Sequence, residues 1–222
     1  MKPRTLAFLD LETTGLDPER HDIVEIGVIR VRGDTLEEIT HTDVRVRPER
    51  LADACPEGLA IGGYSERGWR HAASLREALI WISPYLKGAS LAGHNVAFDR
   101  AFLDARWERT GITPPVMDHH SLDTMMLSWP LLAAGVIESL CLDAITDYLG
   151  IDRSKPHRAL ADARCSLQVA RRLVRPMEFA ALSGTFRRGG AIPTDRRNTT
   201  LGGPTCCVLC CSRDLELERE VA

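Results

Sequence analysis

Residues 5–18 read TLAFLDLETTGLDP, and this stretch decides the fold. Its first half is a short apolar run, which predicts a β-strand, and the Thr-Thr-Gly-Leu-Asp-Pro segment after it is typical of a turn. Asp10 and Glu12 lie two residues apart at the strand end, so their side chains project to the same face. Two adjacent carboxylates repel each other unless a cation joins them. Taken alone, such a pair is more often a solvated edge.

The patterns outward from this strand predict an α/β fold. Residues 23–32 and 36–47 alternate apolar and polar side chains around Gly33-Asp34, which is typical of an antiparallel hairpin. Further along we expect helices over 74–86, 98–109, 139–149 and 160–174, and strands over 90–94 and 121–127. This order predicts a mixed five-stranded sheet covered by helices on both faces.

The composition changes after residue 175, so we expect one domain over 1–175 and a tail over 176–222. The tail has paired arginines and glycines but no sustained apolar period, which predicts disorder. Its segment 206–211, CCVLCC, contains Cys-x-x-Cys, half of a zinc knuckle, with no histidine after His157 to complete it. Metal binding, redox chemistry and contact with a partner stay open for this segment.

The overall charge limits how the chain could bind nucleic acid. The formal net charge is −3, the chain has 222 residues, and 44% of them are hydrophobic. Nucleic-acid binding through bulk electrostatics normally needs a strongly basic balance, so any such contact must be local, for example through protein-held metal ions. The sequence shows neither a secretory signal nor a membrane-spanning apolar run, so we expect a cytoplasmic protein that does not bind membranes.

Two further segments carry acids and a histidine. Asp99 lies where a predicted strand gives way to a helix, the place where open α/β sheets bind ligands, although it could instead stabilise the helix dipole. His157 and Asp162 converge only if His157 precedes the helix, and Pro156 favours this arrangement. Alanines in the first turn of that helix would let it approach the sheet closely.

These residue types suit phosphodiester hydrolysis. The reaction needs a positioned water, a base for its proton and positive charge on the developing phosphate. Carboxylate oxygens favour hard cations such as Mg²⁺ or Mn²⁺ over zinc, and histidine titrates near neutral pH. The sequence therefore predicts a hard-cation site with a histidine beside it.

Three ordered segments also carry a resemblance: residues 8–18 (FLDLETTGLDP), 93–103 (GHNVAFDRAFL) and 157–163 (HRALADA). They resemble the three motifs of the DEDDh, or DnaQ-like, exonucleases, a family that includes the ε proofreading subunit of bacterial DNA polymerase III, ribonuclease T and oligoribonuclease. The resemblance covers residues 5–174 and implies a ribonuclease H-like fold and 3′-to-5′ exonuclease activity. Histidine at position 157, rather than a tyrosine nearer Asp162, is similar to the histidine branch.

The resemblance implies a catalytic set of Asp10, Glu12, Asp99, His157 and Asp162. Asp10 would bridge two Mg²⁺ or Mn²⁺ ions, and Glu12 and Asp162 would complete one metal site. Asp99 would hold the second ion, and His157 would be the general base.

The resemblance also implies a pocket for the 3′-terminal nucleotide, with contacts from Thr13, Gly15, Leu16, His94, Asn95 and Phe98. Other interpretations remain, because Phe98 could belong to the core and Asn95 could cap the following helix. Asp123 matches a further family position, but we interpret it as a structural acid at a strand end. We interpret the four tryptophans as core or surface anchors, too dispersed to form a stacking groove.

The predicted activity is release of nucleoside monophosphates from the 3′ end of single-stranded nucleic acid. DNA is favoured, because Gly93-His94-Asn95 looks closer to the polymerase-associated members of the family. The alternatives are an exoribonuclease, a different nuclease on the same fold and a non-catalytic nucleic-acid-binding module. A DNA polymerase or repair protein would be the partner, and the sequence does not specify an oligomeric state.

Overall fold

A five-stranded mixed sheet forms the centre of the molecule in a computed structural model that describes residues 4–153 and 156–182. The strands are β1 (Thr5–Thr13), β2 (Ile23–Arg32), β3 (Glu38–Arg45), β4 (Ser90–Gly93) and β5 (Ser121–Asp123). Their order across the sheet is β3-β2-β1-β4-β5. β2 is antiparallel to β1 and β3, whereas β4 and β5 run parallel with β1, so the predicted mixed sheet is confirmed.

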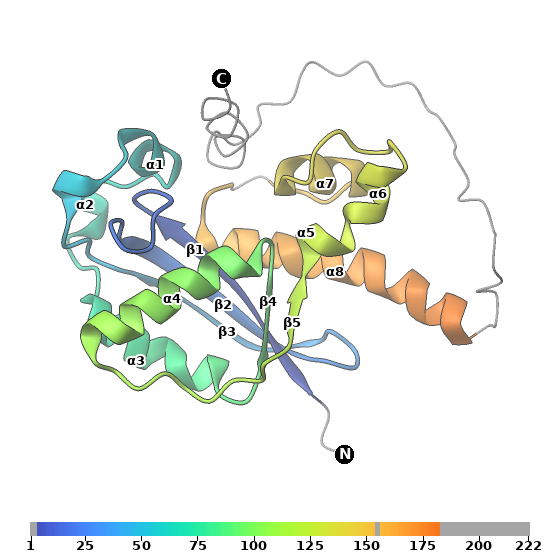
Figure 1. The fold of residues 1–222 in the computed structure, drawn as a ribbon, viewed down its shortest axis with the longest axis horizontal. Coiled ribbons are helices and arrows are strands. Elements are labelled where there is room, and N and C mark those ends of the chain that lie inside the picture. The colour runs from blue at the N-terminus through green and yellow to red at the C-terminus, as the bar shows by residue number, and fades with distance from the viewer. Residues whose placement is uncertain (1–3, 154–155, 183–222) are drawn as a thin grey trace, which may run out of the picture.

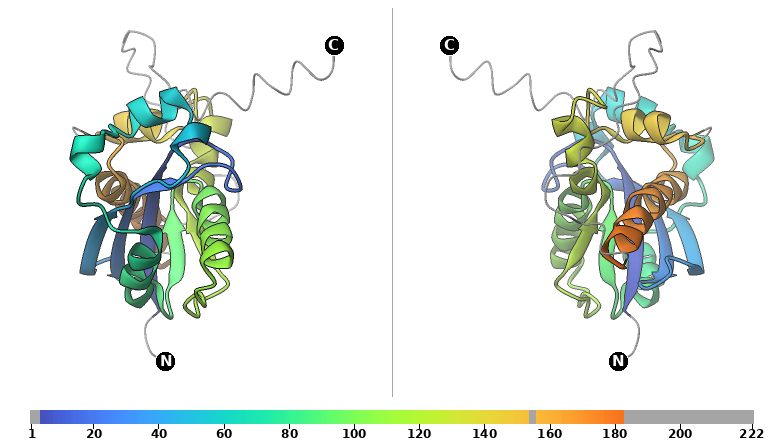
Figure 2. Two further views of the ribbon diagram at one scale, coloured as in Figure 1. Left: turned by 90° about the vertical axis from the view of Figure 1, so that its left-hand side faces the viewer. Right: turned by 90° about the vertical axis from the view of Figure 1, so that its right-hand side faces the viewer.

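Helices cover both faces of this sheet (Figures 1 and 2). On one face, α3 (Leu75–Leu86) and α4 (Val96–Thr110) pack over a core that includes Leu9. On the other, α8 (Ala159–Leu182) packs over a core that includes Phe8, and α7 (Leu142–Leu149) packs against α8. Phe8 and Leu9 enter opposite cores because successive side chains of a strand point to opposite faces. β1 is therefore buried on both sides, which explains its apolar run.

Several short helices connect these elements: η1 (Leu51–Asp53), α1 (Pro56–Ile61), α2 (Glu66–Trp69), α5 (Thr124–Leu127) and α6 (Trp129–Ala133). None of them was predicted from the sequence, and the predicted strand over 121–127 is wrong beyond Asp123. There the Asp123 carboxylate accepts a hydrogen bond from the Met125 N–H at 2.9 Å, which starts α5. A short apolar run does not by itself distinguish a strand from a helix turn.

The C-terminal helix passes the predicted domain boundary at residue 175, since α8 continues to Leu182. The Cys-rich segment 206–211 lies outside the described residues. Within the described ranges, no helix combines the length and the apolar character needed to cross a lipid bilayer.

Candidate active site

A cavity of about 650 Å³ lies at the carboxyl ends of the parallel strands β1, β4 and β5. The predicted catalytic residues all line it: Asp10, Glu12, Asp99, His157 and Asp162. They come from three distant segments, namely the end of β1, the first turn of α4 and the chain entering α8. The structure therefore brings these five side chains together.

β1 supplies the first two acids. Asp10 is paired with Gly27 across β1 and β2, and Glu12 is 9% exposed. Burial raises the pKa of Asp10 well above its ordinary value. The carboxylates of Asp99, Asp162 and Glu12 raise this pKa further, in that order. The site therefore concentrates negative charge that a bound cation would compensate.

α4 supplies Asp99, which is only 3% exposed. Burial raises the pKa of Asp99 well above its ordinary value, although backbone hydrogen bonds at Asp99 and Leu11 oppose the rise. Asp99 thus points toward β1 rather than toward solvent, which disfavours the alternative of an acid that merely stabilises the helix dipole at the surface.

Asp123 holds the start of α4 in place. Its carboxylate accepts hydrogen bonds from the N–H groups of Asn95 at 3.1 Å and Val96 at 3.0 Å, besides that of Met125 in α5. Asn95 is the residue before α4 and has a left-handed backbone with φ 64°, but its side chain forms no capping hydrogen bond. The structural interpretation of Asp123 is confirmed, whereas capping by the Asn95 side chain is wrong.

His157 and Asp162 are positioned by the chain that enters α8. His157 precedes the helix, as the sequence predicted, and the structure gives it a left-handed conformation with φ 58°. Its backbone N–H donates to Asp162 Oδ2 at 3.0 Å. A ring nitrogen of His157 and carboxylate oxygens of Glu12 and Asp162 all lie within 4.8 Å of one another. These three side chains could hold a metal ion, and the carboxylates around them favour a hard cation.

A close contact between α8 and β2 sets the position of Asp162. A Cβ atom placed on Gly27 would lie 2.3 Å from the Leu160 backbone nitrogen, so only glycine fits here. Ala159 is fully buried at the same contact, which confirms that small residues let this turn approach the sheet. Because Gly27 is the cross-strand partner of Asp10, the contact brings Asp162 to the acids of β1. Sequence reasoning missed the role of Gly27.

Two arginines that sequence reasoning missed bind acids around α8. Arg153 donates from Nε to Asp162 Oδ1 and from Nη2 to Asp162 Oδ2, both at 3.0 Å. Arg158 pairs with the buried Glu25 of β2, with Nε 3.0 Å from Oε2. Neither contact has a sequence signal, since an arginine near a helix start is normally solvated.

Most of the predicted substrate-binding residues also line the cavity, namely Thr13, Leu16, His94, Asn95 and Phe98. Gly15 is not among the lining residues. A Cβ atom on Gly15 would lie 2.4 Å from the His21 ring, so this glycine permits close packing of the loop after β1. Phe98 is half-buried and its ring centroid is 4.8 Å from that of Phe102, so it contacts both the core and the cavity.

His94 is fixed at the back of the cavity by both ring nitrogens. Nε2 donates to the carbonyl oxygen of Leu140 at 2.9 Å, and Nδ1 lies 3.1 Å from the Thr124 hydroxyl. Burial lowers the pKa of His94, so the neutral ring is favoured. These contacts make His94 a rigid part of the wall.

Trp129, an aromatic residue, lines the cavity together with the apolar residues Met125 and Leu132. Its exposed fraction is 52%, even though it lines the cavity. The interpretation of the four tryptophans as core or surface anchors did not foresee that Trp129 lines the cavity. It holds for Trp81, which is 58% exposed away from the cavity and donates to the Thr42 hydroxyl at 2.8 Å.

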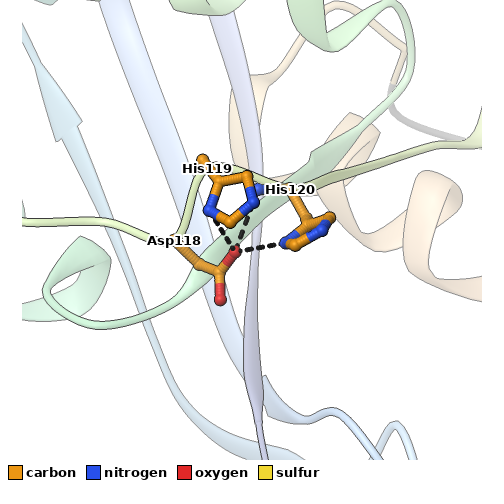
Figure 3. A group of neighbouring side chains, drawn as sticks. All are labelled: Asp118, His119 and His120. Atoms are coloured by element: carbon orange, nitrogen blue, oxygen red, sulfur yellow. Dashed lines mark hydrogen bonds and ion pairs between the residues drawn. The ribbon is translucent and has the colours of Figure 1, made fainter.

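A second group of possible metal ligands, Asp118, His119 and His120, lies just before β5 (Figure 3). Hydrogen bonds from the His120 backbone and ring lower the pKa of Asp118 to about 2. Because β5 runs parallel with β1, this group lies at the amino ends of these strands, whereas the cavity lies at their carboxyl ends. It takes no part in the geometry around Asp10.

Known proteins share both the sequence pattern and the fold. Residues 7–170 match a family described as "Exonuclease". The chain is 31% identical over 182 residues to the DNA polymerase III PolC-type of Thermotoga maritima, covering 78% of this chain but only 12% of that protein. It is 31% identical over 175 residues to the DNA polymerase III subunit epsilon of Escherichia coli, covering 72% of this chain and 68% of that protein.

Solved structures agree on the fold. One is E. coli exonuclease I (ExoI) with single-stranded DNA in a zinc-bound form, with a TM-score of 0.69 and 20% identity over 83% of this chain and 43% of that chain. Another is the nuclease domain of 3′hExo, a DEDDh family member bound to rAMP, with a TM-score of 0.62 and 19% identity over 79% of this chain and 94% of that chain. The predicted ribonuclease H-like architecture is confirmed.

Proposed function

The chain belongs to the exonuclease family, among the 3′-to-5′ exonucleases, and on that premise we propose that it degrades single-stranded DNA from the 3′ end to nucleoside monophosphates. The observation that supports this most is the convergence of Asp10, Glu12, Asp99, His157 and Asp162 on one cavity. An open cavity of about 650 Å³ is large enough to admit a terminal nucleotide.

The proposed metal cofactor is a pair of Mg²⁺ or Mn²⁺ ions held by the four carboxylates. The residues fit such ions, because burial and the neighbouring carboxylates raise the pKa of Asp10 and oxygen donors dominate the site. Bound divalent ions would supply positive charge to the phosphate and lower the pKa of a water.

The protein side chains would perform the remaining tasks. A ring nitrogen of His157 would take the proton of the attacking water. His157 has a left-handed backbone and lines the cavity. Leu16, Phe98 and Trp129 would contact the bases, while Thr13 and Asn95 would contact the sugar and backbone. His94 would support this wall rather than exchange protons, since both of its ring nitrogens are occupied.

DNA is the proposed substrate because the similar proteins include DNA polymerase III subunits and an ExoI–single-stranded DNA complex. The same relatives favour a DNA polymerase or a repair protein as the partner. Co-elution of the full chain with a purified replicative polymerase from the same cell would test that partnership, and separate elution of the two would contradict it.

The decisive experiment compares wild type with Asp10→Asn on end-labelled single-stranded DNA and RNA, with Mg²⁺ or Mn²⁺. We expect wild type to release mononucleotides from the 3′ end first, DNA to be cleaved faster, and Asp10→Asn to lower kcat by roughly a thousandfold, as when an electrostatic catalytic group is removed. Asp118→Asn is the matched control, because Asp118 lies outside the cavity.

Each of the other outcomes would indicate a different activity for this protein. A fully active Asp10→Asn variant would contradict the proposed site. Faster cleavage of RNA would indicate an exoribonuclease, and internal cuts would indicate an endonuclease. Binding without any metal-dependent cleavage would indicate a non-catalytic module.

A further inference from the structure

Arg153 is the only arginine or lysine among the described residues that line the cavity. The same wall carries carboxylates at Asp10, Glu12, Asp99, Glu138, Asp143 and Asp162. The described lining therefore has a large excess of acidic over basic side chains, and Arg153 is the one permanent cation among the described residues there.

The guanidinium of Arg153 binds Asp162 in a bidentate manner. Nε and Nη2 donate to the two carboxylate oxygens, each at 3.0 Å, and the His157 N–H donates to Oδ2 at the same distance. The side chains are only 10% exposed for Arg153 and 6% for Asp162. Such planar, paired hydrogen bonds are the strongest form of a carboxylate–guanidinium contact.

Arg153 also has a second partner. Its Nη1 forms an ion pair with Asp143, in the first turn of α7, whose side chain is 33% exposed. The guanidinium can therefore keep an acidic partner while it loosens its contact with Asp162.

This arrangement conflicts with metal binding at the same carboxylate. An ion held by the carboxylates of Glu12 and Asp162 needs a lone pair of Asp162, whose oxygen Oδ2 already accepts two hydrogen bonds. The guanidinium would also repel a divalent cation placed within a few ångströms of it. The two cations therefore compete for one carboxylate.

We propose, resting on the proposed function, that Arg153 is a built-in competitor for the metal: it neutralises Asp162 in the ion-free enzyme and shifts toward Asp143 when a divalent cation binds. Arg153 keeps the acids folded together without metal, at the expense of metal affinity. Asp143 sets how readily the exchange occurs.

The test is calorimetric titration of the full-length chain with Mn²⁺ alone, comparing wild type with Arg153→Gln. We expect Arg153→Gln to bind Mn²⁺ with a dissociation constant lower on the order of tenfold. A neighbouring positive charge weakens proton binding by a carboxylate by about tenfold or more, and we expect a similar effect on the metal ion. We expect Asp143→Asn to bind Mn²⁺ more weakly than wild type, because Arg153 then has Asp162 as its remaining partner.

Arg164→Gln is the matched control, since Arg164 is likewise an arginine paired with an acid, but its partner is Glu38, Nη1 2.9 Å from Oε2, outside the cavity. Its Mn²⁺ affinity should equal that of wild type. A second readout is the melting temperature. In a chelator, Arg153→Gln should melt at a lower temperature than wild type. Addition of Mn²⁺ should raise the melting temperature of Arg153→Gln by more than it raises that of wild type.

The outcomes separate this inference from the proposed function. If wild type binds Mn²⁺ while Arg153→Gln binds it equally or more weakly, Arg153 supports the metal site and the competitor role is overturned. If wild type binds no Mn²⁺, the proposed metal-dependent function is overturned first, and the inference falls with it.

Discussion

At the scale of single residues, the cavity carries charges that oppose folding. Asp10 has its pKa raised by burial and by three neighbouring carboxylates, so its charged form is destabilised in the folded, metal-free chain. Side chains that bind a substrate or an ion are often placed at a cost in stability. Replacing one of these acids by a neutral residue should therefore increase the free energy of unfolding.

We therefore expect Asp10→Asn to raise the free energy of unfolding in a chelator by about 1 kcal/mol, a common gain when a substitution removes an unfavourable group from a functional site. For a domain of this size the melting temperature should rise by roughly 2–4 °C, measured by differential scanning calorimetry. Excess Mn²⁺ should reverse the order, because only wild type keeps the full ligand set. A melting temperature below that of wild type in the chelator would contradict this prediction.

Asp123 stabilises the helix starts beside the cavity. Asp123→Ala removes hydrogen bonds to three backbone N–H groups at the starts of α4 and α5. Loss of a cap costs about 0.5–2 kcal/mol, and we expect a loss near the upper end in urea unfolding. Asp104→Ala is the control, because the exposed pair that Asp104 forms with Arg100 should contribute little. Equal losses for both variants would argue against a capping role.

Single residues also show what the sequence could and could not predict. The acids and His157 were predictable because their chemical types and order are visible along the chain. Arg153 and Trp129 were not, because their importance depends on which distant residue each contacts. Asn95 was misjudged because its left-handed backbone, rather than its side chain, makes the turn into α4.

At the scale of elements, the packing of α8 on β2 positions the site. Gly27→Ala would place a methyl group against the backbone of Leu160, which cannot rotate away. We expect α8 to shift and kcat to fall by roughly a hundredfold, since displacements of about 1 Å have effects of that size. Gly68→Ala in α2 is the control, because its nearest neighbour is the rotatable hydroxyl of Ser65, 2.9 Å away. Unchanged kcat for Gly27→Ala would show that the contact is not required.

The short helices α5 and α6 shape the rim where a strand would leave the active site. Trp129 begins α6 and is half exposed, so a base can stack on it. In the inactive Asp10→Asn background, Trp129→Ala should weaken binding of a labelled oligothymidylate by about 1–3 kcal/mol, measured by fluorescence anisotropy. Trp81→Ala, a similarly exposed tryptophan outside the cavity, should leave affinity unchanged. Equal affinity of both variants would remove Trp129 from the binding surface.

Elements with a long, regular pattern were predictable, as β1, β2, α3 and α4 show. The failures fall on segments of a few residues, such as α5, where residues 125–127 show no regular spacing of apolar side chains. In such segments a tertiary contact, here the cap from Asp123, selects the conformation.

At the scale of the whole molecule, Asp22 links the loop after β1 to distant segments. Its carboxylate accepts hydrogen bonds from the N–H groups of Glu49 and Arg50, both at 2.7 Å, and pairs with Arg109 of α4 at 3.2 Å. Burial raises the pKa of Asp22, but hydrogen bonds from Arg50 and Glu49 outweigh it, so the pKa is lowered.

A group whose pKa is lower in the folded than in the unfolded state stabilises the fold above its unfolded pKa, near 4, and loses this contribution as pH falls through the folded value. We expect the urea-unfolding free energy of wild type to fall below roughly pH 4 more steeply than that of Asp22→Asn. At pH 7 the variant should be less stable by about 1.5–3 kcal/mol, as for hydrogen bonds to a charged group. Parallel pH profiles for the two proteins would contradict this role.

The assembly of the site from both ends of the domain has a consequence for protein synthesis. The acids of β1 leave the ribosome early, whereas Asp162 is translated much later and reaches them only when α8 docks beside Gly27. A nascent chain would therefore stay harmless to the nucleic acids around it until α8 has emerged and folded.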